Sequence, residues 1–207
     1  SYCGYAAGWL GVYEGNEFLD WAHGSRALSE GEEHEQAMRR EFVRLAARLA
    51  PAPGEIVLLK NARAYAQVTA LHRAVPELVF IRVRREREQV VQSVLGTYRE
   101  LGTFHPVPAA LRGRAIGDPL EFACEQIAAI EAELDAQCAA LPAGAWMEIP
   151  YEAFCAQPLQ HIVRLAGERL GLPREAVRDS PALSRLRASG RQKVTDAEAE
   201  RIRNWRP

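Results

Sequence analysis

Lysine is nearly absent from the sequence: Lys60 and Lys193 are the two lysines among 26 lysine and arginine residues. Neither sign of charge dominates, since the 207 residues carry a formal net charge of −1. Such a chain has no general attraction to nucleic acid or to an anionic membrane surface, so neither is expected as a partner. Any anion-binding site must therefore be local, and Lys60 is notable because lysine is so rare.

Metal-binding and disulfide patterns are missing as well. The cysteines show no CxxC pair and no partnering histidines; they are Cys3, Cys124, Cys138 and Cys155. This spacing indicates neither a zinc site nor a disulfide framework, so we expect reduced cysteines that mostly pack in the interior.

Long apolar runs and targeting segments are also lacking. No apolar run approaches the ~20 residues that a membrane-spanning helix needs. No charged segment followed by an apolar one opens the chain either. We therefore expect a cytoplasmic protein without a membrane span.

Segments with helical and strand-like periodicity alternate from about residue 33 onward, which is typical of an α/β fold with parallel strands. Strands are predicted at 56–59, 78–83 and 145–149, and helices at 34–50, 64–74, 90–101, 118–141, 158–170 and after a capping box of Thr195 and Glu198. The length fits one domain. We expect a single domain over residues 1–207, with a parallel sheet flanked by helices.

Two of the predicted strands end in cations. Lys60 follows the first strand and Arg85 follows the second, and open α/β sheets bind ligands at the carboxyl ends of their strands. A guanidinium presents a planar fork for two phosphate oxygens, and a serine in the next helix, such as Ser93, adds a hydroxyl donor. The sequence thus predicts a phosphate site of Arg85 and Ser93. The alternative, a surface arginine and a serine bonded to its own helix backbone, stays open.

Three segments in this region resemble the sulfotransferase family. Residues 58–61 (Leu-Leu-Lys-Asn), 75–81 and 85–93 follow the order and spacing of the family's patterns LLKxP, FPxAxFI and RDPxxxxxS. Ala62 stands where proline is common, and Glu86-Arg87 replaces the usual Asp-Pro pair. Residues 150–154 (Pro-Tyr-Glu-Ala-Phe) resemble the family's later YEDL-like segment, so the resemblance covers roughly residues 56–173.

The resemblance implies a three-layer fold like that of P-loop NTPases and a donor nucleotide, 3′-phosphoadenosine 5′-phosphosulfate (PAPS), with no metal required. Arg85 and Ser93 would bind the 3′-phosphate. Lys60 would stabilise the charge left on the bridging oxygen when the sulfuryl group leaves. Tyr151 would lie near the adenine, and Glu152 would hold the turn together. The acceptor would be a hydroxyl or amine of a small molecule, sugar or lipid.

A basic loop over residues 185–193 resembles the late basic loop that closes over the 3′-phosphate in the family. Within it we choose Arg191, because the neighbouring Gly190 permits a close backbone approach to a phosphate. Structural interpretations without a binding role stay open for three of these groups: Lys60 as a solvated lysine, Tyr151 as a core aromatic residue and the loop as a solvated charged face.

The family's first phosphate loop, which resembles PRSGTT, has no counterpart in residues 1–50, and no GxxxxGK[ST] motif occurs. We expect this loop and its strand to lie outside the given residues, because residues 1–20 resemble the segment that follows them; its true absence is the alternative. In that segment Glu17 is the candidate general base and Glu14 the second.

The cytosolic branch of the family instead uses a histidine two residues beyond the lysine, a position that Ala62 occupies here. His105 and His72 are possible substitutes. Two other functions stay open: a P-loop kinase-like phosphotransferase, and a noncatalytic nucleotide-binding or interaction protein. Acceptor identity and oligomeric state cannot be inferred from the sequence.

Overall fold

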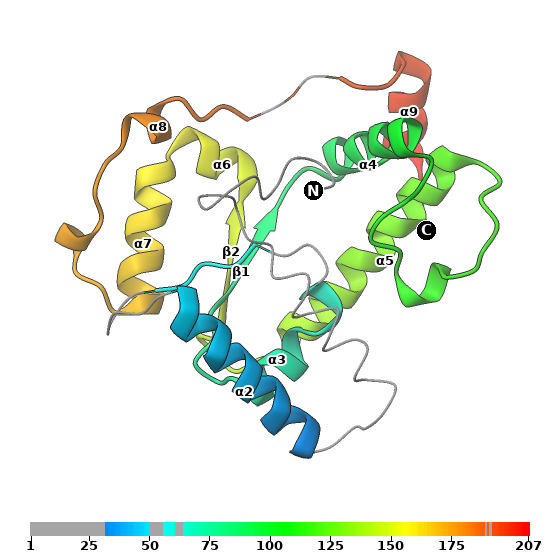
Figure 1. Ribbon diagram of the computed structural model, residues 1–207. Helices are drawn as coiled ribbons and strands as arrows, with labels where there is room; N and C mark the ends of the chain where they lie inside the picture. The colour runs from blue at the N-terminus through cyan, green and yellow to red at the C-terminus, as the bar shows by residue number, and fades with distance from the viewer. Residues whose placement is uncertain (1–31, 50–55, 61–63, 189, 191) are drawn as a thin grey trace. The chain divides into compact units, whose positions relative to one another are not determined.

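The computed structural model describes residues 32–49, 56–60, 64–188, 190 and 192–207. The chain divides into two compact units (Figure 1). Unit 1 comprises residues 1–78 and 136–141, and unit 2 comprises residues 79–135 and 142–207. The prediction of one domain over the whole chain stays a prediction.

Unit 1 is built on helix α2 (Glu32–Leu49), the short helix η2 (Ala64–Ala66) and helix α3 (Val68–Ala74). Acidic residues in the first turn of α2 and Arg48 in its last turn match the direction of the helix dipole. Arg39 on α2 donates two hydrogen bonds to the Glu77 carboxylate, at 2.7 and 3.0 Å. A second pair, Arg73 on α3 and Glu35 on α2 at 2.7 Å, joins the two helices.

The predicted strand at 56–59 is wrong for the described structure. Residues 56–60 lie in neither a helix nor a strand, and the side chains expected to be buried are open to solvent: Ile56 is 50% exposed and Leu58 is 78% exposed. A strand exists only with a hydrogen-bonded neighbour, and a short apolar run does not reveal whether one is present.

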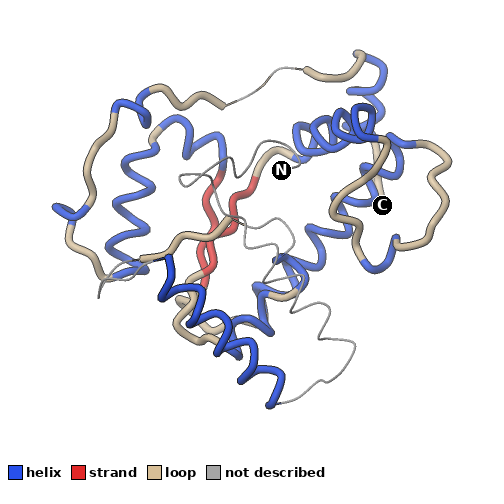
Figure 2. The backbone as a smooth tube through the Cα atoms, in the orientation of Figure 1, coloured by secondary structure: helices blue, strands red, loops and turns tan. Residues whose placement is uncertain are grey.

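Unit 2 contains a parallel pair of strands, β1 (Phe80–Arg84) and β2 (Trp146–Pro150), drawn in red in Figure 2. Phe80 is in register with Trp146 and Arg84 with Pro150. The strands predicted at 78–83 and 145–149 are thus confirmed to within two residues. Because the pairing is parallel, the residues that follow Arg84 and Pro150 emerge at the same edge of the sheet.

The helices of unit 2 flank this sheet, and the chain is an α/β protein, as predicted. They are α4 (Arg87–Leu101), η3 (Ala109–Leu111), α5 (Pro119–Ala139, whose last residues belong to unit 1), α6 (Tyr151–Ala156), α7 (Pro158–Leu170), η4 (Arg174–Ala176), α8 (Pro181–Ser184) and α9 (Asp196–Asn204). Their ends follow the expected local chemistry. Gly171 ends α7 at a φ of 62°, in the left-handed region, and the capping box of Thr195 and Glu198 starts α9.

The core of unit 2 lies between α4, the segment after it, α5 and α9. Val91 and Leu95 from α4 are buried with Ala123 and Ile127 from α5 and Ile202 from α9. Phe104 stacks on the Tyr98 ring, with the ring centroids 4.3 Å apart. The core therefore holds α9, near the end of the chain, against α4 (Figure 1).

Candidate functional site

The ends of β1 and β2 bring together side chains that are far apart in the sequence. Arg85 comes directly after β1, while Tyr151 and Glu152 come directly after β2 and open α6. The register that pairs Arg84 with Pro150 carries these residues to one edge. This is the edge at which open α/β sheets bind their ligands.

Arg85 is held by an aromatic ring and a carboxylate. Its guanidinium carbon lies 4.9 Å from the centroid of the Tyr151 ring, a cation–π distance. Its Nε lies 3.9 Å from Oε1 of Glu152, which is longer than a hydrogen bond. The side chain is 24% exposed. Arg85 is thus orientated by the Tyr151 ring and by the Glu152 carboxylate.

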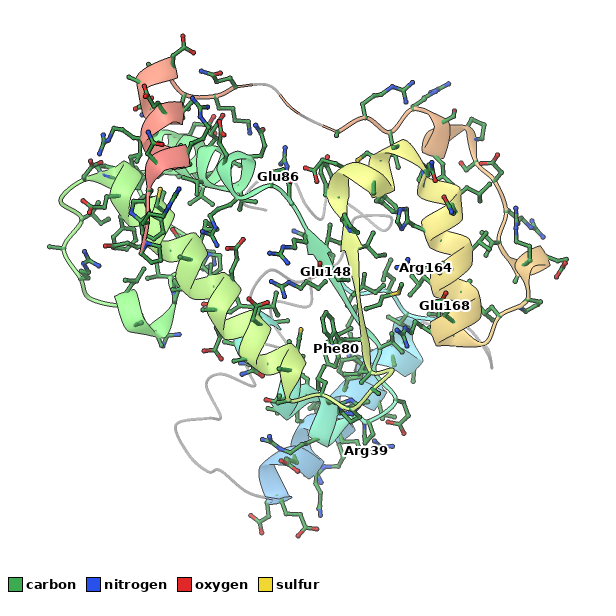
Figure 3. All side chains as sticks on the ribbon, turned by 180° about the vertical axis from the view of Figure 1, so that it is seen from behind. Arg39, Phe80, Glu86, Glu148, Arg164 and Glu168 are labelled. Atoms are coloured by element: carbon green, nitrogen blue, oxygen red, sulfur yellow. The ribbon has the colours of Figure 1, made fainter. Side chains whose placement is uncertain are left out.

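The neighbouring arginines are also engaged with carboxylates of the protein. Arg82 is 8% exposed and pairs with Asp135, and its Nε lies 3.6 Å from Oε2 of Glu148. Arg84 reaches the other oxygen of Glu148 at 3.7 Å; Figure 3 labels Glu148 on β2. Arg87 contacts Glu131 at 2.6 Å. These contacts give the neighbouring arginines structural partners.

Ser93 lies in α4 beside the basic loop. The Nζ of Lys193 donates to the Ser93 hydroxyl oxygen at 3.4 Å, and the Lys193 backbone N–H donates to Oε1 of Gln92 at 2.9 Å. The stem of Lys193 crosses the helix at Gly96, where a Cβ would lie 4.0 Å from Lys193 Cδ. The loop thus brings a cation to the serine predicted to bind phosphate.

Two hollows border this contact. A small one of about 80 Å³ is lined by Ser93, Val94, Thr97, Thr103 and His105. A larger, open one of about 630 Å³ is lined by Arg99, Gln192, Lys193, Val194, Thr195 and Glu198. His105, a possible base from the sequence, thus shares a hollow with Ser93.

The loop is anchored on its carboxyl side by α9. Val194 packs against the core, and Arg99 on α4 forms an ion pair with Glu198. The hydrogen bond from the Thr195 backbone lowers the pKa of the Glu198 carboxyl, and Arg99 lowers it further. Glu198 is therefore charged at neutral pH and binds the start of α9 to α4.

The remaining predicted site residues are not assembled by the described structure. Lys60 belongs to unit 1 and is exposed at the end of the segment 56–60. Glu17, Glu14 and Arg191 lie outside the described residues. His72 lies on α3 in unit 1.

The sequence did not indicate Gln92. The basic loop that carries Lys193 was predicted, but Lys193 was not chosen within it. The scarcity of lysine was a usable signal, because Lys193 is one of two in the chain. Nothing local marks Gln92, whose contact with Lys193 joins residues 101 positions apart.

Within the described part of the chain, no group of three or more histidine, cysteine, aspartate or glutamate side chains could hold a metal ion. None of the described helices is long and apolar enough to cross a membrane.

Similarity to known proteins indicates the family of the chain. A search of curated proteins found no match. The sulfotransferase domain from the curacin biosynthetic pathway is similar in structure, at 17% sequence identity and a TM-score of 0.49, over 78% of this chain and 52% of that one. This chain thus spans about half the length of that protein. The sequence model of the sulfotransferase family matches residues 13–176, which is more than half of the chain. The chain therefore belongs to the sulfotransferase family.

Proposed function

We propose that the protein transfers a sulfuryl group from PAPS to a hydroxyl or amine of its acceptor. The observation that carries the proposal is the arrangement of Arg85, which follows β1 and is held by Tyr151 and Glu152. The contact of Ser93 with Lys193 supports it from the helix that follows.

The 3′-phosphate of the donor is the group that fits these residues. A phosphate monoester carries close to two negative charges and three acceptor oxygens. The Arg85 fork offers two parallel donors, Ser93 offers a hydroxyl, and Lys193 offers a compact charge. Phosphate oxygens replace the 3.9 Å contact between Arg85 and Glu152. Arg191 in the same loop adds a second cation, and Tyr151 contacts the adenine.

The transfer itself needs a base and a cation. Glu17 takes the proton from the acceptor hydroxyl, whose oxygen then bonds to the sulfur of the donor. The bond between sulfur and the bridging oxygen breaks, and the charge that develops on the departing phosphate is stabilised by Lys60. The products are the sulfated acceptor and 3′-phosphoadenosine 5′-phosphate. The acceptor belongs to the class of small molecules, sugars or lipids, and the chemistry requires no metal.

Calorimetric titration of the full-length protein tests this proposal. The ligands are 3′-phosphoadenosine 5′-phosphate, adenosine 5′-phosphate, and ATP with magnesium. We expect tighter binding of the 3′-phosphorylated nucleotide, because Arg85, Ser93 and Lys193 act on that phosphate. A preference for ATP contradicts the proposal and favours phosphoryl transfer, while binding of none of the three favours a noncatalytic protein.

A further inference from the structure

We infer that Gln92 is a positioning residue that fixes the basic loop on α4, so that Lys193 meets the donor's 3′-phosphate beside Ser93. The inference rests on the proposed function for the identity of the phosphate. The contact itself is a feature of the structure, whatever the ligand. Residues 177–207, which include Lys193, lie beyond the match to the family model.

Gln92 is a buried polar side chain. It is 1% exposed, and its neighbours Val91 and Leu95 on the same helix are 0% and 1% exposed. Burying an amide without hydrogen bonds is unfavourable, so a glutamine in such a place is retained where its bonds are satisfied. Both ends of the Gln92 amide have partners: Nε2 donates to Glu88 at 3.1 Å, and Oε1 accepts from Lys193 at 2.9 Å.

The chemistry of the two partners determines which way the amide points. The ionised Glu88 carboxylate is an acceptor only, and the backbone N–H of Lys193 is a donor only. The amide nitrogen of Gln92 must therefore face Glu88, and its oxygen must face the loop. Arg203 on α9 also donates to Oε1 of Glu88, at 3.2 Å, and so holds the carboxylate in place. A chain of contacts thus runs from α9 through Glu88 and Gln92 to the loop.

Lys193 is therefore attached to α4 at two points. Gln92 holds the backbone of Lys193, and the adjacent Ser93 receives its side-chain ammonium at 3.4 Å. An exposed lysine side chain loses much rotamer entropy when it binds a ligand. Fixing its backbone beforehand reduces the ordering that binding requires. Gln92 therefore contributes to nucleotide affinity without touching the nucleotide.

The first test needs no ligand. Gln92→Met keeps the length and burial of the side chain and removes the acceptor. We expect hydrogen exchange at the Lys193 amide to become faster in the nucleotide-free variant, by about tenfold, as for the loss of one hydrogen bond. The matched control is Gln126→Met, because Gln126 is also fully buried and donates to the Pro106 carbonyl at 2.6 Å. Unchanged exchange at Lys193 in Gln92→Met overturns the inference, whatever the protein binds.

The second test is a double-mutant cycle on nucleotide affinity. We expect Gln92→Met to weaken binding of 3′-phosphoadenosine 5′-phosphate by about tenfold and to leave binding of adenosine 5′-phosphate unchanged. In a Lys193→Met background the same substitution should have no further effect, since Gln92 acts through Lys193. Any loss caused by Gln126→Met should persist in that background. An equal loss from Gln92→Met with and without Lys193 overturns the inference, while a wild-type protein with no preference for the 3′-phosphate overturns the proposed function instead.

Discussion

The guanidinium of Arg85 lies over the ring of Tyr151, 4.9 Å from its centroid, although the two residues are 66 positions apart. The parallel register of β1 and β2 brings them together, because each directly follows its strand. Glu152, the next residue, approaches Arg85 from α6 at 3.9 Å. The two residues that follow β2 thus hold the arginine that follows β1.

Replacing Arg85 by lysine tests whether nucleotide binding needs the planar guanidinium or only a positive charge. Lysine keeps the positive charge but loses the planar fork that binds two oxygens at once. We expect Arg85→Lys to weaken binding of 3′-phosphoadenosine 5′-phosphate by roughly tenfold or more, in line with about 1.5–3 kcal/mol for a hydrogen bond to a charged group. Calorimetric titration measures the loss.

The control for this variant is Arg84→Lys. Arg84 precedes Arg85, is 58% exposed and pairs with Glu148. We expect its replacement to change nucleotide affinity little, since exposed ion pairs contribute about 0–1 kcal/mol. An equal loss at the two positions would show that general positive charge, rather than the fork of Arg85, binds the nucleotide.

Tyr151 has two candidate roles, orientating Arg85 and contacting the adenine. The affinities of 3′-phosphoadenosine 5′-phosphate and adenosine 5′-phosphate distinguish them. If the ring acts by orientating Arg85, Tyr151→Leu should weaken the 3′-phosphorylated nucleotide alone, by about threefold for a partly exposed cation–π contact. If the ring contacts the adenine, adenosine 5′-phosphate should lose affinity equally. Tyr151→Phe keeps the ring and should bind both nucleotides as the wild type does. We expect the leucine variant to weaken both nucleotides, and the 3′-phosphorylated one more, because the two contacts use different parts of the site.

The features that the sequence predicts correctly depend on residues close together in the chain. The capping box of Thr195 and Glu198 is complete within four residues, so the start of α9 follows from local chemistry. The same holds for the position of Arg85 after β1, because an apolar strand followed by a cation is visible in the sequence. The parallel sheet then determines the edge at which Arg85 lies.

The features that it misses depend on distant contacts. Whether residues 56–59 form a strand depends on a neighbouring strand, which an apolar run of this length does not specify; Leu58 is 78% exposed in the structure. The pairing of Gln92 with Lys193 depends on the docking of α9 against α4. A glutamine within a helical pattern gives no sign that it will be buried there.

Acidification should loosen the attachment of α9 that anchors the basic loop. The pKa of Glu198 is lowered by the Thr195 backbone hydrogen bond and by Arg99, and that of Asp118 is lowered chiefly by its hydrogen bond from Arg201 on α9. A carboxyl whose pKa is lower in the folded state stabilises the fold above its unfolded value. This contribution is lost as the pH falls through the folded value. The stability that α9 provides should therefore decline as the pH drops below about 4.3, the ordinary glutamate value.

The variant that tests this decline is Glu198→Gln, because glutamine at the third helical position also forms a capping box but does not titrate. We expect its melting temperature to fall less than that of the wild type as the pH drops below about 4.3, because only the wild type loses the contribution of the Glu198 charge there. Glu200→Gln is the matched control, since Glu200 is exposed on the same helix, and it should retain the full wild-type decline. Identical acid profiles for the Glu198 variant and the wild type would show that this carboxylate does not link α9 to α4 in solution. If the variant's profile is flatter, the charge of Glu198 contributes to holding the helix that anchors Lys193.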